Sequence, residues 1–104
     1  SALGNINSTA QHLYSDIGET IKLSCIYSTI SDTPYLFWYR QRGNHIQYIA
    51  LHGGKTQSSF KLINTELEPG KFQSETSNTH TTLTIHHLSV SDSAVYFCAL
   101  RDGA

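Results

Sequence analysis

The chain has 104 residues, a formal net charge of −1 and 38% apolar residues, which fits one globular domain with a single core. Its seven Lys and Arg residues are scattered along the chain, so no basic face for nucleic acid is expected. No apolar run approaches the roughly 20 residues that a membrane-spanning helix requires. If the protein is held at a membrane, we expect its anchor to lie outside these residues.

Short segments of strand-like composition follow one another along the chain. Either they alternate apolar and polar side chains, or they are rich in aromatic and β-branched residues. Turn-like clusters of Gly, Pro, Asp, Asn and Ser separate them. No window has a sustained period of 3.6 residues, so the sequence predicts an all-β sandwich over residues 1–104. The expected strands include residues 21–25, 36–39, 47–51, 82–85 and 94–100.

The sequence has two cysteines, Cys25 and Cys98. Their spacing does not match a C-x-x-C metal motif, which leaves two free thiols or one long-range disulfide in an oxidising compartment. Both fall on inward positions of predicted strands, and Trp38 lies between them in sequence on a third strand. An indole packed on an inter-sheet disulfide gives a small domain a large apolar surface and a covalent tie. The disulfide is therefore the favoured alternative.

The segment DSAVYFC, from Asp92 to Cys98, combines an acid, two aromatic residues and a cysteine. Tyr96 stands two residues before Cys98, where a buried ring can return its hydroxyl to backbone a few residues upstream. Asp92 lies in a predicted turn, where its carboxylate can cap local amides and meet a cation. Lys71, which follows a Glu-Pro-Gly turn, is the expected partner. The alternative is an ordinary turn aspartate.

Together these landmarks resemble a known family. Cys25, Trp38 within YLFWYRQ and the segment DSAVYFC are similar to those of immunoglobulin variable-type (V-set) domains. The FWYRQ run, the Cys-Ala-Leu ending and the TTLTI stretch resemble, more narrowly, the variable domains of T-cell receptor alpha and delta chains. The resemblance covers essentially the whole chain. It implies a V-set β-sandwich of two antiparallel sheets with Greek-key connections and one inter-sheet disulfide.

The end of the chain departs from the family pattern. Variable domains of these receptors continue into a joining segment with a Phe-Gly-x-Gly motif, whereas this sequence ends with RDGA. We therefore expect the final joining strand to be missing, which would leave the strand that carries Phe97 as an exposed edge. Self-association of the chain, or lower stability than a version with a joining strand, is the expected consequence.

Alternation along the predicted strands places an aromatic patch on the outside of one sheet. If Trp38 and Cys98 point inward, their sequence neighbours point outward. An exposed apolar patch of this kind usually marks an interface, and in the resembling family this face pairs with a second variable domain, from a beta or gamma chain. Scattered surface aromatics are the alternative. The residues expected on this surface are Phe37, Tyr39, Gln41, Gln47, Ile49 and Phe97, with Ile46 at the rim.

Three loops at one end of the predicted sandwich are expected to bind ligand. The first mixes small polar residues with an aromatic and an isoleucine, which suits a binding loop, and the second is short and conformationally permissive. In the resembling family these loops bind a peptide on a histocompatibility (MHC) molecule, or an MHC-like, lipid or unconventional ligand. The expected loop residues are Thr29, Ile30, Ser31, Asp32, Thr33, Pro34 and Tyr35 in the first, His52, Gly53, Gly54 and Lys55 in the second, and Arg101, Asp102 and Gly103 in the third.

The six histidines do not predict a metal site. His86 and His87 are adjacent, so their side chains point opposite ways on an extended segment, and the others lack metal-ligand spacing. No G-x-S-x-G elbow supports a nucleophile. We expect no enzyme activity and no cofactor. The sequon Asn7-Ser8-Thr9 allows N-linked glycosylation, with an unmodified surface asparagine as the alternative.

The resemblance implies an antigen-recognition variable domain of a T-cell receptor alpha or delta chain. Such a domain lies on the extracellular side of the plasma membrane and leaves signalling to other subunits. Two alternatives stay open: a germline-encoded innate receptor of variable type, and a V-set adhesion module. Sequence after Leu100 that differs between clones would indicate recombination, whereas a fixed continuation would indicate the innate receptor.

Overall fold

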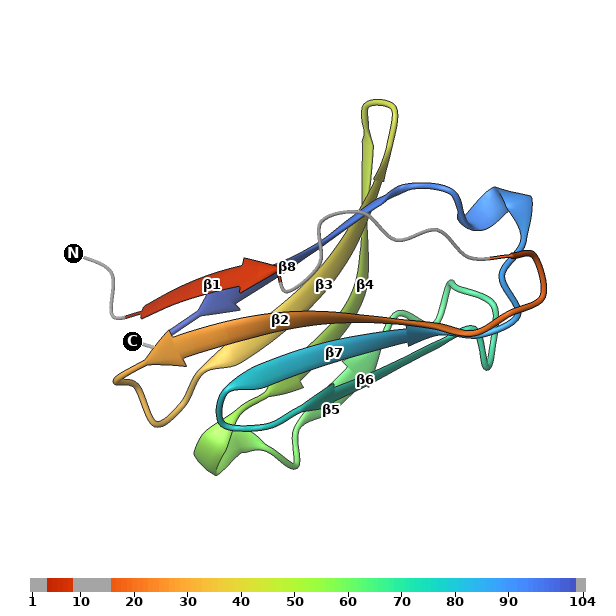
Figure 1. Cartoon of the computed structure of the whole chain (residues 1–104). Helices are drawn as coiled ribbons and strands as arrows, with labels where there is room; N and C mark the ends of the chain where they lie inside the picture. The colour runs from red at the N-terminus through yellow and green to blue at the C-terminus, as the bar shows by residue number, and fades with distance from the viewer. Residues whose placement is uncertain (1–3, 9–15, 103–104) are drawn as a thin grey trace.

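The computed structural model describes residues 4–8 and 16–102 as two antiparallel four-stranded sheets packed face to face (Figure 1). One sheet has the order β1-β2-β7-β6 and the other the order β5-β4-β3-β8. The described residues contain no α-helix, which confirms the predicted all-β sandwich. The strands are β1 (Gly4–Ser8), β2 (Ile21–Thr29), β3 (Tyr35–Arg42), β4 (His45–Gly53), β5 (Lys61–Ile63), β6 (Phe72–Thr76), β7 (His80–Ile85) and β8 (Val95–Arg101), and the 3-10 turns are η1 (Lys55–Gln57) and η2 (Val90–Asp92).

The two sheets are joined by a covalent bond at the centre of the sandwich. Cys25 on β2 and Cys98 on β8 form a disulfide with a Cα–Cα distance of 6.7 Å, so the predicted pairing is confirmed. Trp38 lies directly opposite Cys98 in the β3–β8 register and is 2% exposed. Its Nε1 donates a hydrogen bond to Thr81 Oγ1 on β7, at 3.3 Å, across to the other sheet. Closing a loop of 73 residues contributes about 4 kcal/mol on chain-entropy arguments.

Alternation along the strands explains which side chains fill the core. On β3, Leu36, Trp38 and Arg40 are buried while the residues between them are partly exposed. A residue directly opposite another in an antiparallel pair lies on the same face of the sheet. The inner faces of both sheets therefore meet in one cluster, whose buried members are Cys25, Trp38, Ile49, Ala50, Leu67, Phe72, Leu83 and Ile85.

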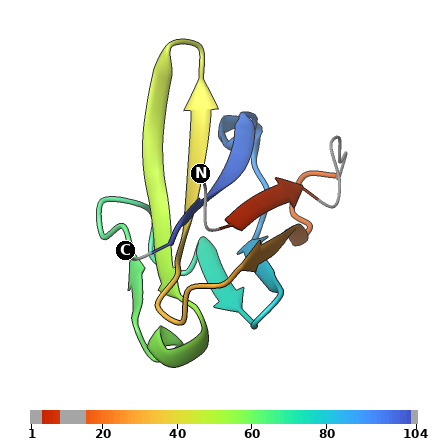
Figure 2. The same ribbon diagram turned by 90° about the vertical axis from the view of Figure 1, so that its left-hand side faces the viewer.

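The loops and turns gather at the two ends of the sandwich. Figure 1 places the β2–β3 loop, η1 and the last described residues at one end and η2 at the other. Figure 2 looks at the first of these ends and shows β3 and β4 in one layer and β1 and β2 in the other. Residues 4–8 and 16–102 include no candidate membrane-spanning helix.

One buried polar atom in the core leads to a stability prediction. Ser74 on β6 is 1% exposed, and its Oγ has no hydrogen-bond partner among the described residues. A buried hydroxyl without a partner costs about 1–3 kcal/mol. We expect Ser74→Ala to raise the free energy of unfolding by about 1 kcal/mol in urea denaturation, whereas Ser28→Ala, at an exposed position of β2, should leave it unchanged. A loss of stability in Ser74→Ala would show that the buried Ser74 hydroxyl does not destabilise the fold.

Candidate functional site

Three aromatic rings stack on the outer face of the β5-β4-β3-β8 sheet. Phe37 and Tyr39 alternate with the buried residues of β3, and Phe97 on β8 lies opposite Tyr39. The ring centroids of Phe37 and Tyr39 are 6.0 Å apart and those of Tyr39 and Phe97 are 5.4 Å apart, with near-parallel planes in both pairs. Tyr48 on β4 meets Tyr39 edge to face at 6.4 Å. We call these four residues the aromatic face.

Polar and aliphatic residues flank the aromatic face at the level of Gln41. Gln41 is partly exposed, and its Nε2 donates to the carbonyl oxygen of Gly43 at 3.2 Å. Ile46 and Val95 lie opposite Gln41 on the two neighbouring strands and are 57% and 64% exposed. The partly exposed rings and these two aliphatic side chains leave an extended apolar surface on one sheet.

The prediction for β4 was wrong, and a β-bulge is the reason. The β3–β4 register shifts between Trp38 and Tyr39: Trp38 lies opposite Ala50, but Tyr39 lies opposite Tyr48. The residue in between, Ile49, is 0% exposed and belongs to the core rather than to the expected interface. An extra residue in one strand changes which side chains face each side, so Tyr48 takes the outward position that alternation had assigned to Ile49.

Gln47 is displaced by the same bulge. It lies opposite the buried Arg40, on the face of the sheet that looks toward the core, and its Oε1 accepts a hydrogen bond from Arg40 Nε at 2.8 Å. Its predicted place on the outer face is therefore also wrong. Tyr48, which strand alternation did not place on this face, is half-buried. Burial and the neighbouring Tyr39 raise the pKa of its hydroxyl, which stays protonated at neutral pH.

Hydrogen bonds tie three chain segments together at the loop end of the sandwich. Lys55 Nζ donates to the carbonyl oxygen of Thr29 at 2.7 Å, and the Thr56 backbone amide donates to that of Asp32 at 3.2 Å. Thr29 Oγ1 donates to Asp102 Oδ1 at 2.8 Å, and Ser31 Oγ donates to the Asp102 carbonyl oxygen. The first loop is therefore bonded to both the second and the third.

The predicted loop residues differ widely in exposure. Ile30 is 82% exposed, and Asp32 and Arg101 are exposed as well, so these three point to solvent at the loop end. Thr29, Ser31, Thr33, Tyr35, Lys55 and Asp102 are partly buried. Tyr35 contacts Phe60 edge to face at 6.0 Å between ring centroids. Gly103 lies outside the described residues.

Pro34, His52, Gly53 and Gly54 are buried, which corrects their prediction as ligand-contacting residues. A Cβ at Gly53 would lie 2.0 Å from the Gln57 carbonyl oxygen, and one at Gly54 would lie 2.6 Å from the Tyr27 hydroxyl. The two glycines therefore allow close packing under the second loop. They do not give that loop conformational freedom. The exposed residues that follow include Thr56, Ser58 and Ser59.

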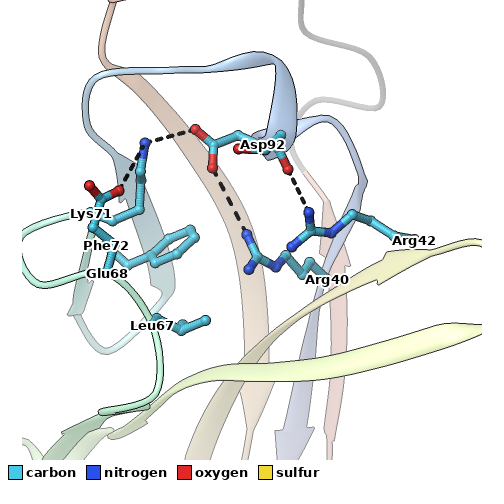
Figure 3. Close-up of a pocket in the computed structure, with 8 residues that line it drawn as sticks. Arg40, Arg42, Leu67, Glu68, Lys71, Phe72 and Asp92 are labelled. Carbon is cyan, nitrogen blue, oxygen red and sulfur yellow. Dashed lines mark hydrogen bonds and ion pairs between the residues drawn. The ribbon is translucent and has the colours of Figure 1, made fainter.

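A cluster of charges closes the opposite end of the sandwich, around a small pocket (Figure 3). Lys71 Nζ lies 2.8 Å from Asp92 Oδ2 and 3.8 Å from Glu68 Oε2, and it donates to the His87 carbonyl oxygen at 2.9 Å. Arg40 Nη1 lies 4.0 Å from Asp92 Oδ1. Both members of the Lys71–Asp92 pair are less than 10% exposed. The expected ion pair is thus present and largely shielded from water.

Asp92 also organises the turn that leads into β8. Its Oδ2 accepts from the Ser89 backbone amide at 2.9 Å, and its carbonyl oxygen accepts from the Tyr96 hydroxyl at 2.7 Å, as expected for that tyrosine. Burial acts to raise the pKa of the Asp92 carboxyl, but the hydrogen bonds from Lys71 and Ser89 and the charge of Lys71 hold it below its ordinary value of 3.8. Burial raises the pKa of Tyr96, so that hydroxyl remains a donor.

Ion pairs and hydrogen bonds hold the charged side chains of this cluster in place. Its acids and bases are paired with one another or with backbone carbonyls, including Arg42, whose Nη1 donates to the Ser91 carbonyl oxygen at 2.7 Å. Among residues 4–8 and 16–102, no three His, Cys, Asp or Glu side chains lie close enough together to hold a metal ion.

Comparison with known proteins identifies the family of this sandwich. The sequence model of the immunoglobulin V-set domain matches residues 9–104. The chain therefore belongs to the immunoglobulin V-set family, whose receptor domains are not enzymes. A chain of the solved structure described as "Structural basis of T cell specificity and activation by the bacterial superantigen toxic shock syndrome toxin-1" has the same fold: the TM-score is 0.82 and the identity 21%, over 97% of this chain and 84% of that one.

The sequence relatives are mostly variable domains of T-cell receptor chains, and a rat Ig kappa chain V region, S211, is also among them, 31% identical over 84% of this chain and 73% of its own length. Human T cell receptor alpha variable 26-1 is 30% identical over 81% of this chain and 71% of its own length. Human T cell receptor alpha variable 3 is 34% identical over 82% of this chain and 70% of its own length. The mouse T-cell receptor gamma chain V region V108B is 32% identical over 94% of this chain and 84% of its own length. The predicted resemblance to T-cell receptor alpha and delta variable domains is confirmed.

The buried ion pair leads to a prediction about pH. Because the pKa of Asp92 is lower in the folded chain than in the unfolded chain, its stabilising effect is complete above the unfolded value and is lost as pH falls through the folded one. We expect Asp92→Asn to lower the free energy of unfolding by about 3 kcal/mol at pH 7, since Lys71 then stays buried without its carboxylate. The deficit should shrink below about pH 4.

Urea denaturation at pH 7 and pH 3 measures how much unfolding free energy Asp92→Asn loses at each pH. Asp16→Asn is the matched control, because Asp16 is an exposed acid outside the cluster. A deficit of Asp92→Asn that is the same at both pH values would show that the carboxylate charge is not what stabilises the turn.

Proposed function

We propose that this chain is an antigen-recognition variable domain of a T-cell receptor alpha or delta chain, that it pairs with a beta or gamma variable domain, and that it binds ligand with its loops. The observation that carries the proposal is the aromatic face. Phe37, Tyr39, Tyr48 and Phe97 are only partly covered, and they lie on the outside of a sheet whose inner side is already packed. Aromatic side chains are enriched at interfaces, where they become the main anchors.

The loop end supports recognition of a ligand beside that interface. The first loop is hydrogen-bonded to the second through Thr29 and Lys55, and to Asp102 through Thr29 and Ser31. Loops that are held in place before binding lose less conformational entropy when they bind. The exposed Ile30, Asp32 and Arg101 then offer one apolar, one acidic and one basic side chain to a ligand such as a peptide on an MHC or MHC-like molecule.

The proposed location is the extracellular side of the plasma membrane. A disulfide between Cys25 and Cys98 forms and persists in an oxidising compartment such as the secretory pathway. The matched variable domains of alpha and gamma chains support the same placement. Signalling is then left to other subunits of the receptor, since the described residues form surfaces for binding.

Pairing is tested by a charge placed in the centre of the aromatic face. Tyr39 contacts Phe37, Tyr48 and Phe97, so Tyr39→Asp would bury an unpaired carboxylate in the interface. We expect it to weaken capture of co-expressed beta or gamma variable domains at least tenfold, which corresponds to about 1.4 kcal/mol. Ser28→Asp places the same charge on an exposed position of the other sheet and should bind as the unmodified chain does.

The measurement is retention of the tagged partner domain, together with circular dichroism to show that both variants fold. If no beta or gamma variable domain is retained by the unmodified chain, or if Tyr39→Asp binds as well as Ser28→Asp, the assignment of this sheet as the pairing surface is wrong.

A further inference from the structure

The sequon Asn7-Ser8-Thr9 is the single Asn-X-Ser/Thr site of the sequence, and its acceptor lies on β1. Ile6 packs against the core, so alternation along the strand turns Asn7 to the outer face of the β1-β2-β7-β6 sheet. The Asn7 side chain is exposed there. From this geometry we propose that Asn7 carries an N-linked glycan in the protein as it leaves the secretory pathway.

The position of Asn7 keeps a glycan away from both proposed binding surfaces. The aromatic face is on the outside of the other sheet, so the two lie on opposite sides of the sandwich. Along β1, Asn7 is three residues beyond Gly4, which pairs with Thr29 at the start of the first loop. Three residues of a strand span about 10 Å. A flexible sugar chain at Asn7 is therefore compatible with pairing and with ligand binding.

The residue opposite Asn7 explains what the glycan would cover. Asn7 pairs with Ile26 of β2, which is 48% exposed on the same outer face. Ile26 is flanked along β2 by Ser24 and Ser28 and lies opposite His80 on β7. Cβ atoms of directly opposed residues are about 4.5–5.5 Å apart, so the first sugar attached to Asn7 lies within reach of the Ile26 side chain.

The sugar would add bulk on the outer side of β1. β1 is the outer strand of its sheet in the described residues, with β2 as its neighbour, and it lies beside β8 of the other sheet (Figure 1). An N-linked glycan is a bulky, solubilising group. Glycosylation of Asn7 would therefore shield the exposed Ile26 side chain.

The modification is a group transfer from a lipid-linked oligosaccharyl pyrophosphate. A bond forms between Asn7 Nδ2 and C1 of the first sugar, and the bond between that C1 and the pyrophosphate oxygen breaks. The lipid pyrophosphate leaves with the bonding electrons, and the amide nitrogen gives up one proton to a base of the transferase. The proposal depends on passage through the secretory pathway, which is part of the proposed function.

The test is expression of the chain with a secretory leader in mammalian cells, followed by peptide N-glycosidase F. The first basic residue is Lys22, so trypsin releases residues 1–22 as one peptide. We expect peptide N-glycosidase F to remove one glycan from the intact protein. The tryptic peptide of residues 1–22 should then contain aspartate in place of Asn7. Thr9→Ala and Asn7→Gln should both abolish the modification, whereas Thr9→Ser should keep it, because it preserves the sequon.

Disulfide formation separates failure of this proposal from failure of the proposed function. If Cys25 and Cys98 are bonded and the peptide of residues 1–22 carries unmodified Asn7, the chain has met the oxidising compartment and the glycan proposal is wrong. Capture of a beta or gamma variable domain is measured on the same sample and does not depend on the sugar.

The shielding role has its own readout. We expect Asn7→Gln to increase retention on a hydrophobic column and the aggregated fraction in sedimentation, and the double variant Asn7→Gln/Ile26→Thr to reverse both. Thr is chosen because it keeps β-branching at an exposed strand position. Glycosylated and Asn7→Gln proteins that behave alike in both measurements would show that the sugar does not cover Ile26.

Discussion

The contact between Trp38 and the Cys25–Cys98 disulfide sets the inside and the outside of the molecule. Trp38 and Cys98 are directly opposed on β3 and β8, and the disulfide holds β8 to β2 of the other sheet. Since side chains alternate along a strand, fixing these two residues toward the core sends Phe37, Tyr39 and Phe97 to the outer face. The aromatic face is therefore a geometric consequence of how the core is built.

The bulge in β4 shows how a local irregularity changes a binding surface. Without it, Ile49 would lie opposite Tyr39 and face outward. With it, Ile49 joins Ala50 in the core and Tyr48 moves beside Tyr39. The exchange adds an apolar side chain to the core and gives the outer face an aromatic ring that contacts Tyr39 and has a polar hydroxyl. One extra residue thus adds Ile49 to the core and Tyr48 to the aromatic face of the same sheet.

Much of the fold could be predicted because its strongest signals are local or are carried by unusual residues. Alternation at residues 21–25 and 82–85 marks β2 and β7, and Trp38 with the two cysteines marks the centre. β1 and β5 gave no comparable signal, because GNINS is mostly polar and KLI is only three residues long. Their pairing with β2 and β4 is a property of the assembled sheets and is not encoded in either segment alone.

The errors in the site predictions have a common physical cause. Periodicity assigns faces correctly only while the strand is regular, so nothing in HIQYIAL indicated that Gln47 and Ile49 would turn inward after a bulge. Likewise, Gly53 and Gly54 have the composition of a flexible turn, but the space for a Cβ is already filled by Gln57 and Tyr27. Whether a glycine is there for freedom or for close packing depends on neighbours that are distant in sequence.

Bonds between segments distant in sequence hold both ends of the sandwich. At the η2 end, Lys71, just before β6, pairs with Asp92 of η2, and the Tyr96 hydroxyl of β8 donates to the Asp92 carbonyl oxygen. Removing one partner of the buried ion pair leaves the other charge without its partner. At the loop end, Lys55 Nζ donates to the carbonyl oxygen of Thr29, and the Thr56 backbone amide donates to that of Asp32. The bond between Thr56 and Asp32 joins two backbone groups, so the exposed Asp32 side chain can be replaced without removing it, whereas replacement of Lys55 removes the bond to Thr29.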